Sequence, residues 1–163
     1  MACGNIVIEG GTITASGGVG CAGIGGGSGA TCGYISITHG TVTATGGDCS
    51  AGIGGGQQGK CGTISIAKTI TSVTATKGNN GTPESSTDPY SIGIGSDILD
   101  YGSNSDVKCG TITFDTESFT PTWKQGDSDH PNAWTYSPEP ASGTYGGLTL
   151  AIDGNTWTLT PKN

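Results

Sequence analysis

A 29-residue repeat is the feature that most constrains the fold of this chain. Residues 3–31, CGNIVIEGGTITASGGVGCAGIGGGSGAT, return with few changes as residues 32–60, CGYISITHGTVTATGGDCSAGIGGGQQGK. A third copy begins at Cys61 with CGTISIAKTITSVTATKG, and a fourth begins at Cys109 with CGTITF. Self-similarity at a fixed period of this length is typical of solenoids, in which each repeat buries its apolar face against its neighbours.

Each repeat predicts three short β-strands. Apolar and polar residues alternate with a period of two, and glycine pairs separate the runs as sharp corners would. Stacked coil on coil, each strand would pair with its counterpart one turn away, at roughly 4.8 Å along the axis. The residues expected to stack inside are Ile6 and Ile8 with Ile35 and Ile37, Ile64 and Ile66, and Ile112 and Phe114; Ile13 and Ala15 with Val42 and Ala44, and Val73 and Ala75; and Ile24 with Ile53 and Ile94. We therefore predict an all-β fold, a right-handed parallel β-helix (β-solenoid) of about three and a half coils, with the hand taken from the rule for parallel crossovers.

The later coils depart from the regular pattern. The third, residues 61–108, has 48 residues instead of 29, and its insertions within 77–108 are polar and rich in turn-forming residues. In the fourth coil, Phe119 is expected at the position that Val42 holds in the second. Insertions into a solenoid often shape a binding surface, so this side of the molecule is of interest for function.

Two units are predicted along the chain. Residues 1–122 hold the β-solenoid coils, and residues 123–163 form a C-terminal aromatic cap, since seven of the ten aromatic residues follow residue 113. Within the cap, GLTLAIDGNTWTLTP predicts a β-hairpin that turns at Asp153-Gly154 or Gly154-Asn155. Such a cap would cover the apolar residues and unpaired strand edges of the last coil.

Charge narrows the expected partners. The chain has 6 Lys, no Arg and 13 acidic residues, for a net charge of −7. Phosphate recognition needs clustered positive charge, so we expect neither nucleic acid nor an anionic membrane surface as a partner. No apolar run is long enough for a membrane span, and no signal peptide is visible. Because Met-Ala-Cys leads directly into a repeat, we expect this to be a piece of a longer protein, with any signal or anchor elsewhere.

The combination GTVTATGG…AGIGGG…CGTISI, followed by SVTATKG…PYSIGIGS…CGTITF, resembles glycine-rich repeats of large surface proteins of gut Bacteroidales, over about residues 3 to 114. More broadly, it is similar to right-handed parallel β-helix proteins, which include adhesins, phage fibres, polysaccharide lyases and carbohydrate-binding modules. The resemblance implies an extracellular or bacterial cell-surface location and glycans or surface proteins, of host or microbe, as partners. Fold alone does not choose among these functions.

The six cysteines have two structural interpretations. They lack the close pairing, such as C-x2-C, that a zinc site needs. Cysteines at one corner of successive coils could stack as small buried apolar residues, or could form disulfides, since Cα separations near 5 Å permit the bond. We favour at least one disulfide and leave the pairing open. The six are Cys3, Cys21, Cys32, Cys49, Cys61 and Cys109.

Hydroxyl side chains form regular outward rows in the predicted coils. Such arrays resemble the ice-binding faces of some solenoid antifreeze proteins. The interpretation we favour is simpler, because threonine is β-branched and polar and so suits the outer face of a strand. The rows are Thr12 and Thr14, Thr41 and Thr43, Ser72 and Thr74, and Ser118 and Thr120.

Acidic residues gather in the second half of the chain, with nine of the thirteen between Glu84 and Asp129. Asp97, Asp100 and Asp106 crowd one insertion and are candidate ligands for calcium, which prefers carboxylate oxygens. They could equally serve a polysaccharide lyase as base and metal ligands. Lyases of this fold usually add Arg or Lys to stabilise the developing anion, and this chain has no Arg. We favour a solvated loop.

Aromatic residues in TWKQGDSDHPNAWTYSPEP are the candidate glycan-binding residues. Trp123, Trp134 and Tyr136 could stack on sugar rings, while Asp127 and Asp129 accept hydrogen bonds from sugar hydroxyls. The alternative, which we favour, is that these rings form the small core of the cap, since aromatic side chains bury large apolar areas.

The function predicted from the sequence is that of a non-enzymatic extracellular surface module, structural or adhesive, with glycans as the expected ligand. No catalytic residue and no cofactor are predicted, and calcium is the one candidate ion. The alternatives are a polysaccharide-lyase-like enzyme and a purely architectural spacer. An enzyme needs a convergent cation and carboxylate, a binding module needs exposed aromatic rings, and a spacer needs neither.

Overall fold

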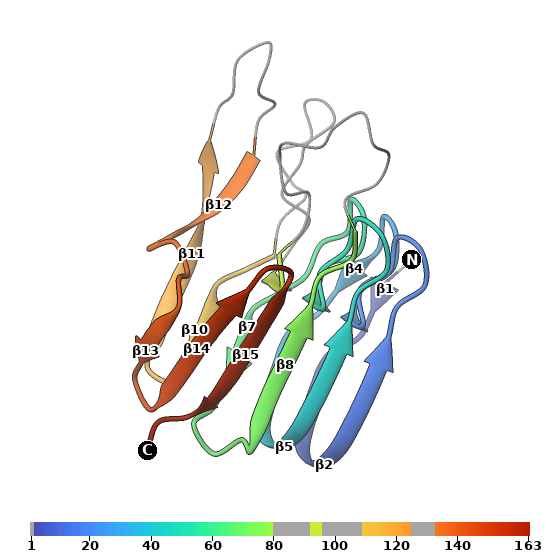
Figure 1. Ribbon diagram of the computed structural model, residues 1–163. Coiled ribbons are helices and arrows are strands. Elements are labelled where there is room, and N and C mark those ends of the chain that lie inside the picture. The colour runs from blue at the N-terminus through green and yellow to red at the C-terminus, as the bar shows by residue number, and fades with distance from the viewer. Residues whose placement is uncertain (1, 80–91, 96–108, 125–132) are drawn as a thin grey trace.

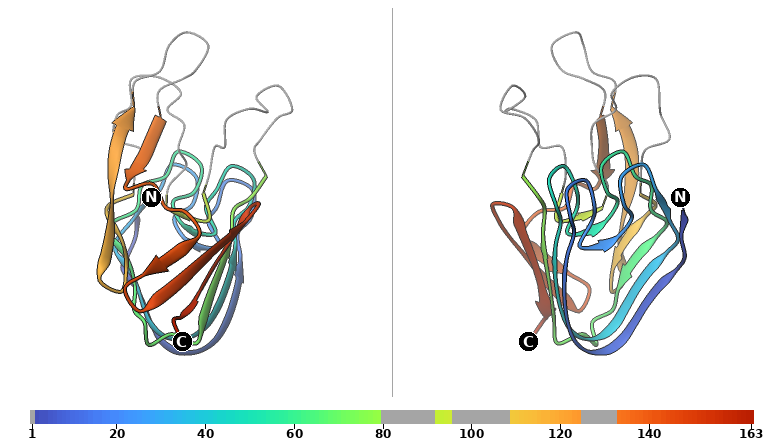
Figure 2. Two further views of the ribbon diagram at one scale, coloured as in Figure 1. Left: turned by 60° about the vertical axis from the view of Figure 1, so that its left-hand side comes forward. Right: turned by 90° about the vertical axis from the view of Figure 1, so that its right-hand side faces the viewer.

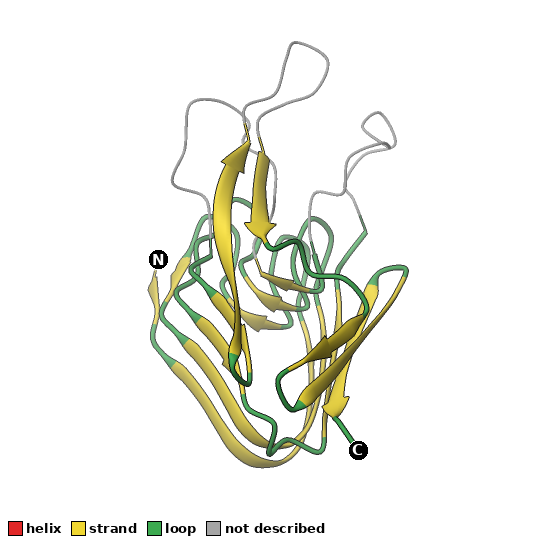
Figure 3. Cartoon of the chain, turned by 90° about the vertical axis from the view of Figure 1, so that its left-hand side faces the viewer, coloured by secondary structure: helices red, strands yellow, loops and turns green. Residues whose placement is uncertain are grey.

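The computed structural model describes residues 2–79, 92–95, 109–124 and 133–163. Over these residues the chain consists of β-strands and loops, without a helix (Figure 3). The prediction of an all-β fold is therefore confirmed.

The coils stack through one strongly curved sheet (Figure 1). Strands β2 (Ile6–Ser16) and β5 (Ile35–Thr45) pair in parallel along both of their arms. In the third coil the same path is split into β7 (Ile64–Ile66) and β8 (Ser72–Thr76), which pair in parallel with the first and second arms of β5. Strand β10 (Ile112–Phe114) then adds in parallel to β7. In each of these strand pairs, the partners are the residues that hold equivalent positions in successive repeats.

Two smaller parallel sheets complete the coils. Strands β3 (Ile24–Gly25), β6 (Ile53–Gly54) and β9 (Ile94–Gly95) form a three-stranded sheet, and Ile24, Ile53 and Ile94 stand in register. Strands β1 (Ala2–Cys3) and β4 (Thr31–Cys32) pair at another corner. In Figure 2 these segments lie across the open side of the curved sheet, so that the coils surround a shared interior.

Aliphatic ladders fill that interior, as the alternation in the sequence predicts. Burial is complete in the middle of the stack because each side chain there contacts its counterparts in the coils on both sides. The fully buried members of the ladders are Ile35, Ile37, Val42, Ala44, Ile53, Ile64, Val73, Ala75, Ile94 and Ile112.

Glycine is required where coils meet at their tightest corners. Gly54 has a φ of 134°, a conformation that side-chain-bearing residues rarely adopt. A Cβ at this position would also collide with the carbonyl oxygen of Gly95 in the next coil. The glycine repeat therefore sets how closely neighbouring coils approach.

The C-terminal end changes the stack from parallel to antiparallel pairing. On one arm, β11 (Glu117–Lys124) folds back on β10, and β12 (Ala133–Ser137) folds back on β11. On the other arm, β15 (Thr156–Pro161) pairs antiparallel with β8, followed by β14 (Leu148–Asp153) and β13 (Gly143–Tyr145). The result is one ten-stranded mixed sheet in which antiparallel strands cover the last parallel ones. The predicted hairpin is present, with Asp153 opposite Thr156 across its turn.

The placement of Phe119 in a fourth coil is wrong. The chain reverses at Asp115, whose φ of 54° suits a tight turn, and Phe119 pairs antiparallel with Ile112 instead of continuing around the coil. The position beyond Val73 is occupied by Leu159 of β15. Ser118 likewise lies opposite Thr113 and does not extend the hydroxyl rows.

The C-terminal strands share one hydrophobic core with the coils. Leu148, Leu150 and Trp157 belong to the same buried cluster as the isoleucine ladders. The sequence boundary between residues 122 and 123 falls inside β11, which runs from the core of the coils into the β11–β12 hairpin.

Three aromatic rings fill the closed end of the curved sheet. Phe114 and Phe119 have ring centroids 5.1 Å apart, and Tyr145 packs 5.0 Å from Phe119 in an edge-on arrangement. Phe114 and Phe119 are completely buried. These three rings therefore belong to the core of the closed end.

Candidate functional site

The β11–β12 hairpin carries the two tryptophans of the predicted glycan site. Trp123 and Trp134 are direct partners across this hairpin, between the pairs formed by Thr122 with Thr135 and by Lys124 with Ala133. Strand β12 is the last strand of the sheet on this side, and the hairpin extends away from the coils (Figures 1 and 3). Two indole-bearing residues thus occupy one level of a projecting edge.

Tyr136 has a different position from the tryptophans. It lies opposite Pro121, is 5% exposed and belongs to the hydrophobic core. Its hydroxyl reaches the three-stranded sheet, because a Cβ built at Gly95 would lie 3.1 Å from the Tyr136 oxygen. A ring this buried offers no face to a sugar, so we leave Tyr136 out of the candidate surface and regard it as the anchor of the hairpin.

The acidic candidates lie outside the described residues. These are the predicted calcium ligands and the predicted hydrogen-bond acceptors for glycan hydroxyls, namely Asp97, Asp100, Asp106, Asp127 and Asp129. Within the part of the chain that the structure describes, no group of three or more His, Cys, Asp or Glu side chains is placed to hold a metal ion.

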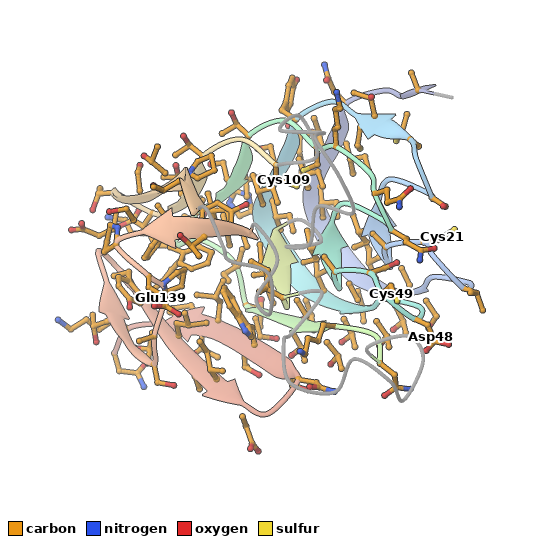
Figure 4. The ribbon with its side chains drawn as sticks, turned by 90° about the horizontal axis from the view of Figure 1, so that it is seen from above. Cys21, Asp48, Cys49, Cys109 and Glu139 are labelled. Carbon is orange, nitrogen blue, oxygen red and sulfur yellow. The ribbon has the colours of Figure 1, made fainter. Side chains whose placement is uncertain are left out.

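Four cysteines stack at one corner of the coils, as predicted. Cys3 pairs in register with Cys32, and Cys61 with Cys109. The backbone N–H of Cys32 donates to the carbonyl of Lys60, which places Cys61 in the same file. The corner therefore presents a column of thiols, with Cys109 at its C-terminal end (Figure 4).

All six cysteines are free thiols, so the expected disulfide is not present in the structure. The thiol of Cys32 instead donates a hydrogen bond to Cys3 Sγ at 3.3 Å. Burial, reinforced by this hydrogen bond, raises the pKa of Cys32 to about 12 from 9.0. The pKa of Cys109 is raised well above 9.0, first by complete burial and then by its hydrogen bond with Cys61. Cys32 and Cys109 are thus protonated thiols of low reactivity.

Cys21 and Cys49 lie on loops of neighbouring coils, well away from Cys109 (Figure 4). The backbone N–H of Gly20 donates to the carbonyl of Asp48, so that Cys49 stacks on Gly20 and not on Cys21. The same offset of one residue is present in the sequence, where Cys21 lies 18 residues after Cys3 and Cys49 lies 17 residues after Cys32. Both cysteines are partly exposed.

The hydroxyl rows extend further than the sequence indicates. Thr14, Thr43 and Thr74 stand in register across three coils, and β15 of the C-terminal region continues the row with Thr158. Next to it, the hydroxyls of Thr76 and Thr156 are 3.0 Å apart. The alternation of polar and apolar residues in TWTLT indicates a strand with outward threonines. The sequence did not predict that this strand continues the hydroxyl row, because no repeat spacing connects it with the coils.

Comparison with protein families finds a similarity in the first two coils. Residues 6–28 and 35–57 each match the family model described as a beta helix repeat. The first two coils are similar to that repeat. No curated protein and no solved structure gives a significant match to the chain. Among the described residues, no helix is long and apolar enough to cross a membrane.

Proposed function

We propose that this chain is a non-enzymatic module of an extracellular or cell-surface protein, with a structural or adhesive role, and that it binds glycans at the β11–β12 hairpin. The observation that carries the proposal is the cross-strand pair of Trp123 and Trp134 on this projecting hairpin. We also propose that the repeats are related to those of bacterial surface proteins. The coils, about three and a half of them, are proposed to wind with a right hand, as parallel crossovers usually do.

The chemistry of a sugar explains why a tryptophan pair would suit it. A pyranose ring presents C–H groups on its faces and hydroxyls at its rim, so that it packs against an electron-rich aromatic face. Trp123 and Trp134 are direct partners in the strand pairing, so that one tryptophan of each strand stands at the same level of the hairpin. The adjacent pair, Thr122 with Thr135, directs its hydroxyl groups to the opposite face of the hairpin.

The architecture of the coils supports a structural role. Their interior is a continuous ladder that connects every coil with the next, and their outer arms carry hydroxyl-bearing side chains. A stiff, weakly charged stack of this kind can hold a binding hairpin at a fixed distance from whatever carries it.

A disulfide between Cys3 and Cys32 is part of this proposal for an oxidising extracellular setting. The two residues are direct partners on parallel strands, and the Cα spacing of such partners falls within the range that a disulfide accepts. Oxidised glutathione would accept the two electrons, one thiol would become part of the mixed disulfide, and the second thiol would displace glutathione. Intact mass before and after this treatment tests the bond through a loss of two hydrogens that disappears in Cys3→Ala.

The test of glycan binding is an array screen followed by calorimetry with the best glycan. The purified chain is compared with Trp123→Ala/Trp134→Ala and with Tyr34→Ala, a control that removes an aromatic ring 46% exposed on another part of the surface. We expect saturable binding that is lost in the double variant and kept in the control. Thermal unfolding of all three proteins checks that the hairpin change leaves the coils folded.

Three results would contradict this assignment. Equal binding by the double variant would place the ligand elsewhere, and absence of binding on the array would favour the architectural spacer. Formation of unsaturated products from uronic-acid polymers would favour the lyase-like alternative.

A further inference from the structure

One face of the curved sheet carries only small hydroxyl side chains. It is formed by the second arms of β2 and β5 together with β8 and β15, which lie side by side along nearly the same axis in Figure 1. Three outward residues of each strand are threonine or serine, and none of the twelve is buried. We call these residues the threonine face: Thr12, Thr14 and Ser16 of β2; Thr41, Thr43 and Thr45 of β5; Ser72, Thr74 and Thr76 of β8; and Thr156, Thr158 and Thr160 of β15.

The threonine face is a regular grid. Strand pairing places Thr14, Thr43, Thr74 and Thr158 in one row across the four strands. Thr160 lies two residues beyond Thr158 and therefore on the same side of β15. Neighbouring strands are roughly 4.8 Å apart, and outward residues of one strand recur about every 6.6 Å. Hydroxyl-bearing side chains thus repeat at fixed spacings in two directions.

The grid is held rigid from below. Between its rows, the inward side chains of Val42, Ala44, Val73 and Ala75 are completely buried, and so is Leu159 of β15. Close packing of these residues fixes the backbone that carries the outward side chains. Threonine is also β-branched and restricted at χ1, so its methyl and hydroxyl groups have few alternative positions.

Neither the repeat nor strand propensity accounts for this composition. Strand β15 lies outside the repeat and enters antiparallel, yet every outward residue from Thr156 to Thr160 is threonine. On the first arm, the same repeat places Val7, Ser36 and Ser65 in one outward row. Strand propensity would favour threonine on both arms. The threonine is therefore concentrated on one face, across strands of different origin.

We propose that the threonine face binds the surface of an ice crystal. None of its twelve residues is charged or aromatic, so it offers neither an ion pair to a charged ligand nor a ring to a sugar. A partner that gains from the whole grid must repeat in two directions, form hydrogen bonds and carry no net charge. The water molecules at the surface of ice meet these conditions, and their spacings in the hexagonal lattice are close to those of the grid.

The free energy of such a contact depends on the number of positions that match at once. A single hydroxyl gains little, because it exchanges a hydrogen bond with liquid water for one with the crystal. Immobilising a water molecule costs up to about 2 kcal/mol, but the water molecules of a crystal are already ordered. The threonine methyl groups leave liquid water in the same contact. Many weak contacts on one rigid grid therefore add up to firm attachment.

The experiment is uptake into ice that grows slowly from a dilute solution of the purified chain, together with the rate of ice recrystallisation. We compare the unmodified protein with Thr43→Tyr in the middle of the grid and with Thr158→Tyr on β15. The matched control is Ser36→Tyr, which places the same ring at a half-exposed position of β5 on the other arm. Thermal unfolding of all four proteins shows whether each variant keeps its fold.

We expect the unmodified protein and Ser36→Tyr to enter the ice and to slow recrystallisation. Thr43→Tyr and Thr158→Tyr should be excluded from the ice, because a large ring holds the crystal away from the neighbouring hydroxyls. The tryptophan pair of the β11–β12 hairpin lies outside the grid, so Trp123→Ala/Trp134→Ala should enter the ice like the unmodified protein.

Four results would overturn the proposal. These are exclusion of the unmodified protein from the ice, equal uptake of Thr43→Tyr and Ser36→Tyr, and normal uptake of Thr158→Tyr, which would remove β15 from the face. The fourth is binding to crystalline cellulose without uptake into ice, lost in Thr43→Tyr, which would give the face to a polysaccharide.

Discussion

The carboxylate of Asp115 accepts a hydrogen bond from the backbone N–H of Gly147, with 2.8 Å between Asp115 Oδ2 and Gly147 N. Asp115 lies in the turn between β10 and β11, and Gly147 lies in the turn between β13 and β14. These turns belong to the antiparallel segments on the two arms of the curved sheet. The hydrogen bond therefore joins the two arms where the stack ends.

Removing this link should loosen the closed end. We expect Asp115→Ala to lower the free energy of unfolding by about 1–2 kcal/mol, because a partly buried N–H loses its charged acceptor. Asp115→Asn keeps an acceptor oxygen and should lose less. Urea unfolding of the three proteins measures the difference, and equal losses in both variants would show that the acceptor has no part in it.

The contact between β15 and β8 should contribute more to stability than any single surface residue. Leu159 is completely buried opposite Val73. Leu159→Ala should lower the free energy of unfolding by about 2–5 kcal/mol, because it leaves a cavity in a packed core. Thr160→Ala is the matched control, since Thr160 is exposed on the same strand. The prediction fails if the two variants unfold at the same urea concentration.

Gly54 offers a test of the spacing between coils. Gly54→Ala should lower the free energy of unfolding by about 1–3 kcal/mol or more, because a Cβ meets both an unfavourable φ and the backbone of Gly95. Gly18→Ala is the comparison, since a Cβ at Gly18 meets nothing within 4 Å. A thermal shift assay suffices, and equal midpoints would mean that the corner can relax.

The buried thiols should make the protein less stable in alkaline solution. The pKa of the Cys32 thiol is about 12 in the folded protein, compared with 9.0 for a thiol that is not buried. Above pH 9 the thiol therefore loses its proton in the unfolded chain but keeps it in the folded protein. The stability that this thiol contributes is complete below pH 9. It falls by about 1.4 kcal/mol per pH unit as the pH rises toward 12.

The same fall applies to Cys109, whose pKa is raised in the same direction. The measurement is the free energy of unfolding at pH 8 and pH 10 under reducing conditions, for the protein and for Cys32→Ala/Cys109→Ala. Lysine and tyrosine titration affects both proteins, so the test is the difference between them. Equal slopes would show that neither thiol is shielded.

The sequence predicted the coils well because their fold repeats one local rule. Alternation with a period of two assigned Ile35, Ile53 and Val73 to the interior, and the 29-residue spacing brought each next to its counterpart. Register followed because a shift by one residue would turn every apolar side chain outward. The thiol column was predictable for the same reason.

The closed end was not predictable from that rule. CGTITF reads as another coil, but the reversal at Asp115 depends on turn geometry that the repeat does not encode. The pairing of Leu159 with Val73 joins segments far apart in sequence, and such pairs leave no periodic signal. For the candidate site, the sequence proposed Trp123, Trp134 and Tyr136 together. The strand pairing shows that the two tryptophans are direct partners, and the burial of Tyr136 shows that this residue is core.

The strict register between coils has a consequence for molecular length. The coil of residues 32–60 pairs in the same register with the coil before it and with the coil after it. A duplicated copy of this segment could therefore be inserted, and each duplication would lengthen the molecule by roughly 4.8 Å while both ends stayed as they are. Gene duplication could thus change the length of the stack in equal steps without altering the residues of the β11–β12 hairpin.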